Sequence, residues 1–212
     1  IKKQGQVAIG LKVDLTNTEE IENLICVTLD EFKKINILVV TAGIGKFTPF
    51  LEISKEEWLK IMEVNLNGSF YVSQAVAKVM VDQKKGGSIV LVSSTGADMP
   101  TNQLSHYCVS KAGLKMLTKC MATELGNYRI NVNCILPGLI ETAMTAPMLE
   151  RKKWQNMAKA TTPLGRWGQP WEVAKLISFL VSEDASFITG QAISICGGYS
   201  LVLEFNWLPL DY

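Results

Sequence analysis

Tyr107 and Lys111 are the residues whose types and spacing point most directly to acid–base chemistry. They stand four positions apart, so in a helix their side chains leave the same face. An ammonium beside a phenol favours the phenolate, which would lower the pKa of the tyrosine from about 10 toward neutrality and make it a usable acid or base. The same spacing occurs on ordinary helices, so the pair needs support from its surroundings.

Ser94 gives the first part of that support. It comes thirteen residues before Tyr107 and follows the apolar run that begins at residue 88. A parallel sheet places its ligands at the carboxyl ends of the strands, where such a residue would lie. A serine hydroxyl there could hydrogen-bond the oxygen atom of a substrate, and Ser93 is an alternative for this role.

Short apolar runs alternate with longer amphipathic segments, which is the pattern of strand–helix–strand units. The expected strands are residues 7–13, 37–40, 88–93, 129–135 and 191–195. The expected helices are residues 17–34, 54–82 with a break, 105–125 and 170–181, with a helical insertion at 143–159. We therefore expect a single α/β domain over residues 1–212, in which helices cover both faces of a doubly wound parallel sheet in three layers.

The composition narrows the classes of function. Hydrophobic residues make up 48% and charged residues 19% of the 212 positions, and the net charge is +1, which favours a globular protein without a nucleic-acid surface. No apolar run approaches the roughly 18 residues of a membrane span. The five cysteines are scattered and His106 is the single histidine, so neither a disulfide framework nor a metal site is expected. This favours a reducing compartment, either the cytoplasm or an organelle matrix.

Further motifs occur in order around these residues. They are V-S-S at 92–94, Y-C-V-S-K-A-G at 107–113, N-V-N-C-I-L-P-G at 131–138, Thr142, P-L-G-R at 163–166 and I-T-G at 188–190. In these motifs the chain resembles the short-chain dehydrogenase/reductase family, over about residues 7–200. The resemblance implies a Rossmann-type fold and the reversible reduction of a small ketone or aldehyde to an alcohol, with NAD or NADP as cofactor. It also implies a homodimer or homotetramer, formed through helices near residues 58–80 and 105–125.

The family's catalytic roles carry over to four residues by motif. Tyr107 would protonate the carbonyl oxygen as hydride arrives, and Lys111 would lower the pKa of the tyrosine and bind the nicotinamide ribose. The family's spacing selects Ser94 over Ser93 as the serine that binds the substrate oxygen. Asn65 would hold a water molecule of the proton relay, and it could also mark a kink in its helix.

Three segments would contact the cofactor. Asp14 and Leu15 resemble the family's acidic–apolar pair beside the adenine ring. Ala42 and Gly43 resemble its Asn-Ala-Gly turn, although Thr41 replaces the asparagine, which weakens the stabilising role of the turn more than it affects catalysis. The segment that orients the nicotinamide carboxamide would contain Pro137, Gly138, Ile140 and Thr142.

The family's N-terminal glycine-rich turn has no counterpart, because the sequence contains no G-x-x-x-G-x-G. The first two strands of the doubly wound sheet would then be absent, leaving residues 37–40 at a sheet edge and the cofactor pyrophosphate without its helix N-terminus. The missing segment could belong to the molecule but lie outside this sequence, another chain or a rearranged sheet could fill the gap, or the chain could be a fragment. A natural truncation would make it a non-catalytic structural or assembly subunit.

The C-terminal part departs from the family as well. Cys196 stands where the family usually has aspartate, and an apolar tail follows. We expect the tail at 203–212 to pack on a neighbouring subunit or to close the substrate pocket. The stretch at 165–168 and the loop at 96–104 are expected to shape that pocket. Neither the substrate nor the choice between NAD and NADP is predicted.

Overall fold

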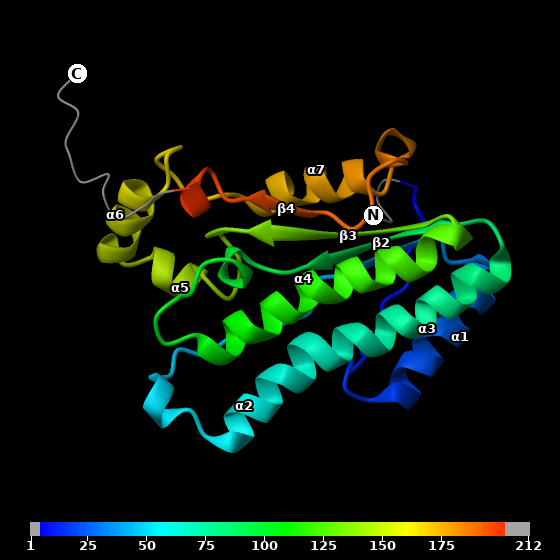
Figure 1. The fold of residues 1–212 in the computed structure, drawn as a ribbon, viewed down its shortest axis with the longest axis horizontal. Helices are drawn as coiled ribbons and strands as arrows, with labels where there is room; N and C mark the ends of the chain where they lie inside the picture. The colour runs from blue at the N-terminus through cyan, green and yellow to red at the C-terminus, as the bar shows by residue number, and fades with distance from the viewer. Residues whose placement is uncertain (1–4, 202–212) are drawn as a thin grey trace.

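Four parallel strands form the centre of the molecule (Figure 1). The structure is a computed structural model that describes residues 5–201. The strands are β1 (Ile37–Val40), β2 (Gly87–Val92), β3 (Ile130–Pro137) and β4 (Ala192–Ile195), and they lie side by side in this order. Val92 pairs with Ile135, and Pro137 pairs with Ile195. The carboxyl ends of β2, β3 and β4 therefore meet at one edge of the sheet.

Helices cover both faces of this sheet, as Figure 1 shows. The helices on one face are α1 (Thr18–Phe32), α3 (Gly68–Gln83) and α4 (Ser105–Leu125), and α7 (Pro170–Leu180) lies on the other. α2 (Lys55–Met62) runs into α3 through a π-helical turn at Glu63–Asn67. α5 (Ala146–Leu149) and α6 (Lys152–Thr161) lie beyond the carboxyl ends of the strands. The expected three-layer α/β arrangement with a parallel sheet is confirmed.

The core has one part on each face of the sheet. Ile89 and Leu91 of β2 are fully buried in the cluster that includes Leu114 of α4. Val90, between them, points to the opposite face and packs in a second cluster with Leu180 of α7. Successive residues of a strand point to opposite faces, so a strand that is apolar at every position can be buried on both.

Capping residues explain where several helices begin. The Asn17 side chain accepts hydrogen bonds from the backbone N–H groups of Glu19 and Glu20, at 3.0 and 3.3 Å, and α1 starts directly after it. α7 starts with Pro170 at a favoured first-turn position, and Gln169 and Glu172 form a capping box around it. These caps agree with the helix starts expected from the sequence.

One expectation about the N-terminal part is wrong. Residues 7–13 do not form a strand, and Val7, Ile9 and Leu11 are exposed. A strand exists through the hydrogen bonds of its ladder, and within residues 5–201 no strand lies beside this segment. Of the four residues of β1, only Val40 is buried. β1 is an edge strand of the described sheet, so its remaining side chains keep contact with solvent.

Within the described residues, no helix has both the length and the apolar character that crossing a bilayer requires. The tail at 203–212, for which a subunit contact or a pocket-closing role was expected, lies outside the described residues.

Candidate active site

Ser94, Tyr107 and Lys111 come together at the carboxyl end of β2. Ser94 follows β2 and caps the 3-10 turn Thr95–Ala97, where its Oγ accepts a hydrogen bond from the Gly96 N–H at 3.0 Å. Tyr107 and Lys111 lie on the first two turns of α4, and the Lys111 Nζ lies 5.6 Å from the centre of the Tyr107 ring. A methyl group added at Gly96 would lie 3.4 Å from the Ser94 Oγ and 3.7 Å from the Tyr107 ring, so these two side chains lie close together. The structure therefore brings the three side chains to one place, and their catalytic roles stay predictions.

Ser93 and Ser94 have separate partners. The Ser93 hydroxyl is buried and donates to the backbone carbonyl of Lys111 at 2.8 Å. That hydrogen bond ties the end of β2 to α4 and occupies the Ser93 hydroxyl. Of the two serines, Ser94 is the one whose side chain lowers the pKa of Tyr107, which favours it as the substrate-binding serine.

Lys111 is a buried cation that reaches the carboxyl end of β2. Lys111 is only 4% exposed, and its Nζ donates to the backbone carbonyl of Val92 at 3.0 Å. Burial lowers the pKa of the ammonium to about 8, since removal from water penalises the charged form. An ammonium carries three hydrogens, so the bond to Val92 leaves two that can meet a ligand.

The pKa of Tyr107 is raised from its ordinary value, because burial favours the neutral phenol, and the hydrogen bond with Ser94 only partly opposes this. The sequence predicted that the pKa of Tyr107 is lowered toward neutrality, and this prediction is therefore wrong for the protein alone. The reason is geometric: the Lys111 ammonium stands over the ring face and is bonded to Val92, rather than to the phenol oxygen. The phenol is consequently protonated at neutral pH and suited to donate its proton.

Asn65 lies in the π-helical turn between α2 and α3 and is fully buried. Its side chain accepts from the Ile44 N–H at 2.8 Å, and donates to the Ile44 carbonyl at 2.9 Å and to the Ser110 hydroxyl at 3.0 Å. The expected helix irregularity is present at this residue. These contacts make Asn65 a link between the segment after β1 and α4, and the expected water-holding role stays a prediction.

The turn after β1 reaches the same cluster. A methyl group added at Gly43 would lie 3.1 Å from the Lys111 Nζ and 3.4 Å from the Asn65 Oδ1, so a larger residue here would crowd both side chains. At Gly45, an added methyl would lie 3.4 Å from the Tyr107 ring. Gly43, and with it the adjoining Ala42, thus lies next to the lysine, and the expected contact of this turn with the cofactor stays a prediction.

Asp14 and Leu15 make contacts elsewhere. Hydrogen bonds from the Thr16 N–H and hydroxyl lower the pKa of the Asp14 carboxyl, and the residue is exposed. Leu15 packs on Gly68 at the start of α3. These contacts put the pair beside α1 and α3, and its expected place beside an adenine ring stays a prediction.

The segment at 137–142 is tied to the segment at 166–172. Gly138 donates to the Ile195 carbonyl at 3.0 Å and packs against Cys196 so closely that an added methyl would lie 2.8 Å from the Cys196 Cβ. Ile140 forms a bridge with Gly168, and the Thr142 N–H donates to the Thr145 hydroxyl at 2.9 Å. The four residues expected at the nicotinamide therefore lie on one anchored strip, which begins at the last residue of β3.

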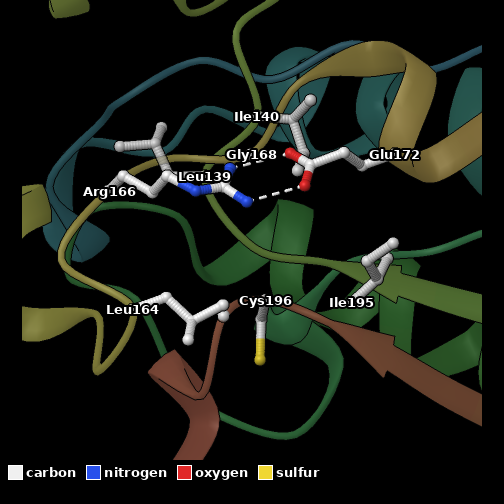
Figure 2. A pocket seen from close by; sticks show the side chains of 9 residues that line it. Leu139, Ile140, Leu164, Arg166, Gly168, Glu172, Ile195 and Cys196 are labelled. Atoms are coloured by element: carbon white, nitrogen blue, oxygen red, sulfur yellow. Dashed lines mark hydrogen bonds and ion pairs between the residues drawn. The ribbon is translucent and has the colours of Figure 1, made fainter.

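A cavity of about 110 Å³ lies beside this strip (Figure 2). Its walls include Ile140, Leu164, Ile195 and Cys196, and the paired side chains of Arg166 and Glu172 close one side. Two hydrogen bonds of 2.8 and 2.7 Å join that pair. Arg166 and Gly168 belong to the stretch that was expected to shape a pocket, although whether this cavity receives a substrate stays a prediction.

Within residues 5–201, no cluster of three or more His, Cys, Asp or Glu residues has the arrangement of a metal site.

Comparisons with known proteins show the family to which the chain belongs. A family model described as enoyl-(acyl carrier protein) reductase matches residues 1–200. An L-rhamnose 1-dehydrogenase (NAD(P)(+)) from Sphingomonas sp. strain SKA58 is 35% identical over 204 residues, which is 96% of this chain and 80% of that protein. A 3-oxoacyl-(acyl-carrier-protein) reductase from Vibrio cholerae is 36% identical over 198 residues, 93% of this chain and 80% of that protein.

The crystal structure of a short-chain type dehydrogenase/reductase from Mycobacterium marinum matches with a TM-score of 0.89 at 35% identity, covering 93% of this chain and 78% of that one. The chain belongs to the short-chain dehydrogenase/reductase family. The relatives act on different substrates by name, so membership of the short-chain dehydrogenase/reductase family does not identify the substrate.

Several residues that position the site of this short-chain dehydrogenase/reductase were missed by sequence reasoning. The Glu141 carboxylate accepts hydrogen bonds from the side chains of Trp167 and Gln169, at 3.0 and 2.9 Å, and so holds the segment at 137–142 in place. Glu57 similarly contacts His106, directly before the tyrosine. These partners are 26 to 49 positions apart, and no periodicity or motif in a single sequence joins residues at such separations.

Proposed function

We propose that this protein is an oxidoreductase that interconverts a ketone or aldehyde with the corresponding alcohol, using a nicotinamide cofactor. The observation that carries the proposal is the convergence of a serine hydroxyl, a protonated phenol and a buried ammonium at the carboxyl end of β2. Each of the three has a distinct use in carbonyl chemistry. Membership of a family whose members include dehydrogenases and reductases supports the same reaction class.

In the proposed reaction, the Ser94 hydroxyl donates a hydrogen bond to the carbonyl oxygen of the substrate. The Tyr107 hydroxyl donates its proton to that oxygen as it becomes an alkoxide. The raised pKa of Tyr107 keeps the proton available at neutral pH, and the nearby Lys111 ammonium stabilises the phenolate that remains. Alcohol oxidation uses the same groups in reverse. Asn65 is proposed to support the relay that returns a proton to the tyrosine.

The residues around Lys111 fit NAD or NADP. Gly43 lacks a side chain where one would crowd Lys111, and the ammonium retains two hydrogens for the hydroxyl groups of a ribose. Lys111 and Tyr107 would hold the nicotinamide ribose, and Asp14 and Leu15 the adenine. The residues that would hold the nicotinamide itself are Pro137, Gly138, Ile140 and Thr142, with Ala42 and Gly43 beside them. The bound cofactor supplies or accepts the hydride.

The pyrophosphate of the cofactor raises a separate question, because the sequence contains no G-x-x-x-G-x-G. The four described strands do not test whether the family's first two strands are absent from the molecule, and this stays a prediction. Measuring the mass of the intact natural protein would test it. A mass that matches these 212 residues alone would support absence, whereas a larger mass would place the segment in the molecule.

We further propose that the protein works as a homodimer or homotetramer in a reducing compartment, such as the cytoplasm or an organelle matrix. Exposed apolar side chains on the helices that pair in this family, such as Phe70 and Met116, support the assembly. Free thiols at all five cysteines support the compartment.

Titration of the natural protein with NADH and NADPH, followed by a screen of carbonyl compounds, tests the proposed function. The proposal predicts saturable binding of at least one cofactor and oxidation of that cofactor with some ketone or aldehyde. Failure to bind either cofactor would overturn the proposal and would favour a structural subunit. Inorganic phosphate and AMP serve as controls for binding that does not involve the nicotinamide.

A further inference from the structure

The residue before the catalytic tyrosine, His106, is the only histidine of the chain and is fully buried. Its Nδ1 lies 2.9 Å from the backbone nitrogen of Tyr107, and its Nε2 lies 3.0 Å from the Glu57 Oε1. A backbone N–H can only donate, so Nδ1 is the acceptor and the ring hydrogen of the neutral imidazole is on Nε2. The histidine thus joins the backbone of Tyr107 to a carboxylate of α2.

That carboxylate also holds the segment that follows β1. Glu57 accepts hydrogen bonds from the Thr48 hydroxyl and from the Lys46 ammonium, in addition to the one from His106. These hydrogen bonds, the one from Lys46 first, lower the pKa of Glu57 to about 2. The carboxylate is therefore ionised at neutral pH, and an ionised acceptor makes stronger hydrogen bonds than a neutral one.

The segment at 43–49 is held at both ends. At its start, Ile44 exchanges two hydrogen bonds with the buried Asn65 side chain. At its end, Thr48 is bound to Glu57 and also donates its N–H to the Gln103 carbonyl at 2.9 Å. Between these anchors, Gly45 lies against the ring of Tyr107. One network therefore contacts Tyr107 at two points: His106 binds its backbone N–H, and the segment at 43–49 packs against its ring.

We infer that Glu57 and His106 form a positioning pair, which holds the segment at 43–49 and the hydroxyl of Tyr107 in the orientation that proton transfer requires. The pair touches neither substrate nor cofactor and acts through Tyr107. The inference rests on the proposed reductase function. Misplacing a reacting group by about 1 Å can cost roughly 10²-fold in rate, so losing such a link should lower kcat more than it alters cofactor binding.

Two substitutions at Glu57 separate positioning from folding. Glu57→Ala removes the carboxylate that accepts from Lys46, Thr48 and His106. Glu57→Gln keeps an amide oxygen that can accept from the His106 Nε2–H and from Thr48. We expect Glu57→Ala to lower kcat by about tenfold or more, with KM for the cofactor within about twofold of wild type. Glu57→Gln should recover most of kcat. Glu56→Ala is the matched control, because Glu56 is the exposed neighbour in the same turn of α2.

A second measurement does not depend on activity. Hydrogen exchange followed by mass spectrometry should show faster exchange of the backbone amides at 43–49 in Glu57→Ala than in wild type, Glu57→Gln or Glu56→Ala. His106→Phe, which fills the ring volume without its hydrogen bonds, should give the same result. The double variant, with His106→Phe and Glu57→Ala together, should exchange about as fast as either single variant, because both substitutions break the same link.

The outcomes distinguish this inference from the proposed function. If the wild type reduces carbonyl compounds and Glu57→Ala matches Glu56→Ala in kcat and in exchange, the positioning pair is wrong and the proposed function stands. Equal loss of kcat in Glu57→Ala and Glu57→Gln, with a lower melting temperature in both, would also overturn the inference in favour of a role in folding alone. If the wild type reduces no carbonyl compound, the proposed function fails, and the exchange measurement still decides whether the link exists.

Discussion

Ser93 and Ser94 show how adjacent residues of the same type divide structural and chemical work. Ser93 is buried and bonded to the Lys111 carbonyl, whereas the Ser94 side chain lies near the Tyr107 ring. The sequence placed both at the end of a strand and the family's spacing selected Ser94, but the bond that occupies the Ser93 hydroxyl is visible only in the folded chain. At this scale, motif spacing predicted which residues meet. It could not predict the partners of Glu57 and His106, which are brought together only by the packing of α2 on α4.

Exchanging each serine for alanine should separate the two hydroxyls by their effect on kcat. Ser94→Ala is expected to lower kcat by about 10²-fold, since a hydrogen bond to the developing oxyanion is lost, and loss of its bond from the Gly96 N–H should lower the free energy of unfolding by about 1 kcal/mol. Ser93→Ala should lower the free energy of unfolding by about 1 kcal/mol as well, with a much smaller effect on kcat. Steady-state kinetics and urea denaturation of both variants check this. A larger loss of kcat in Ser93→Ala than in Ser94→Ala would make Ser93 the substrate-binding residue.

The buried ammonium of Lys111 should make stability depend on pH. Its pKa is lowered to about 8 from the usual 10.5, so between these values the unfolded chain binds more protons than the folded chain. The free energy of unfolding contributed by Lys111 should therefore rise with pH from about 8 toward 10, by at most about 1.4 kcal/mol per pH unit. Below pH 8 the penalty of burial is fully present. Urea denaturation of wild type and Lys111→Met at pH 7, 8 and 10 measures the effect, and a difference that stays constant from 8 to 10 would contradict it.

At the scale of elements, periodicity and caps predicted most of the fold. The helix expected at 105–125 has the bounds of α4, and the strand expected at 37–40 has those of β1. The prediction of a strand at residues 7–13 was wrong because a strand needs a neighbouring strand to pair with, as well as an alternating pattern of its own. β3 runs to Pro137, two residues beyond the expected end at 135, since its pairing with β4 continues there.

The turn before β2 should be sensitive to a single methyl group. Gly86 has a φ of +75°, and an added Cβ would lie 2.4 Å from the Arg129 carbonyl oxygen. Gly86→Ala should therefore lower the free energy of unfolding by more than about 1 kcal/mol. Gly126→Ala is the control, because nothing lies within 4 Å of its added methyl. Thermal or urea denaturation measures both, and equal stabilities would show that the turn relaxes without cost.

At the scale of the whole molecule, the outer face of α4 should carry a subunit contact. Met116 on this helix is 57% exposed, and burial of such apolar surface drives association. Met116→Asp would place a charge in the proposed interface and should shift the protein toward the monomer in sedimentation velocity at micromolar concentration. Met157→Asp, at an exposed methionine of α6, should leave the oligomeric state unchanged. A wild type that is monomeric at these concentrations would contradict the proposed assembly.

The most direct test of the whole account is to remove one oxygen atom from Tyr107. Tyr107→Phe keeps the ring between α4 and the segment at 43–49 but removes the proton donor. The account predicts a fall in kcat of at least about 10²-fold, with the dissociation constant of NADH or NADPH nearly unchanged. A variant that reduces the same carbonyl compound at the wild-type rate would contradict it.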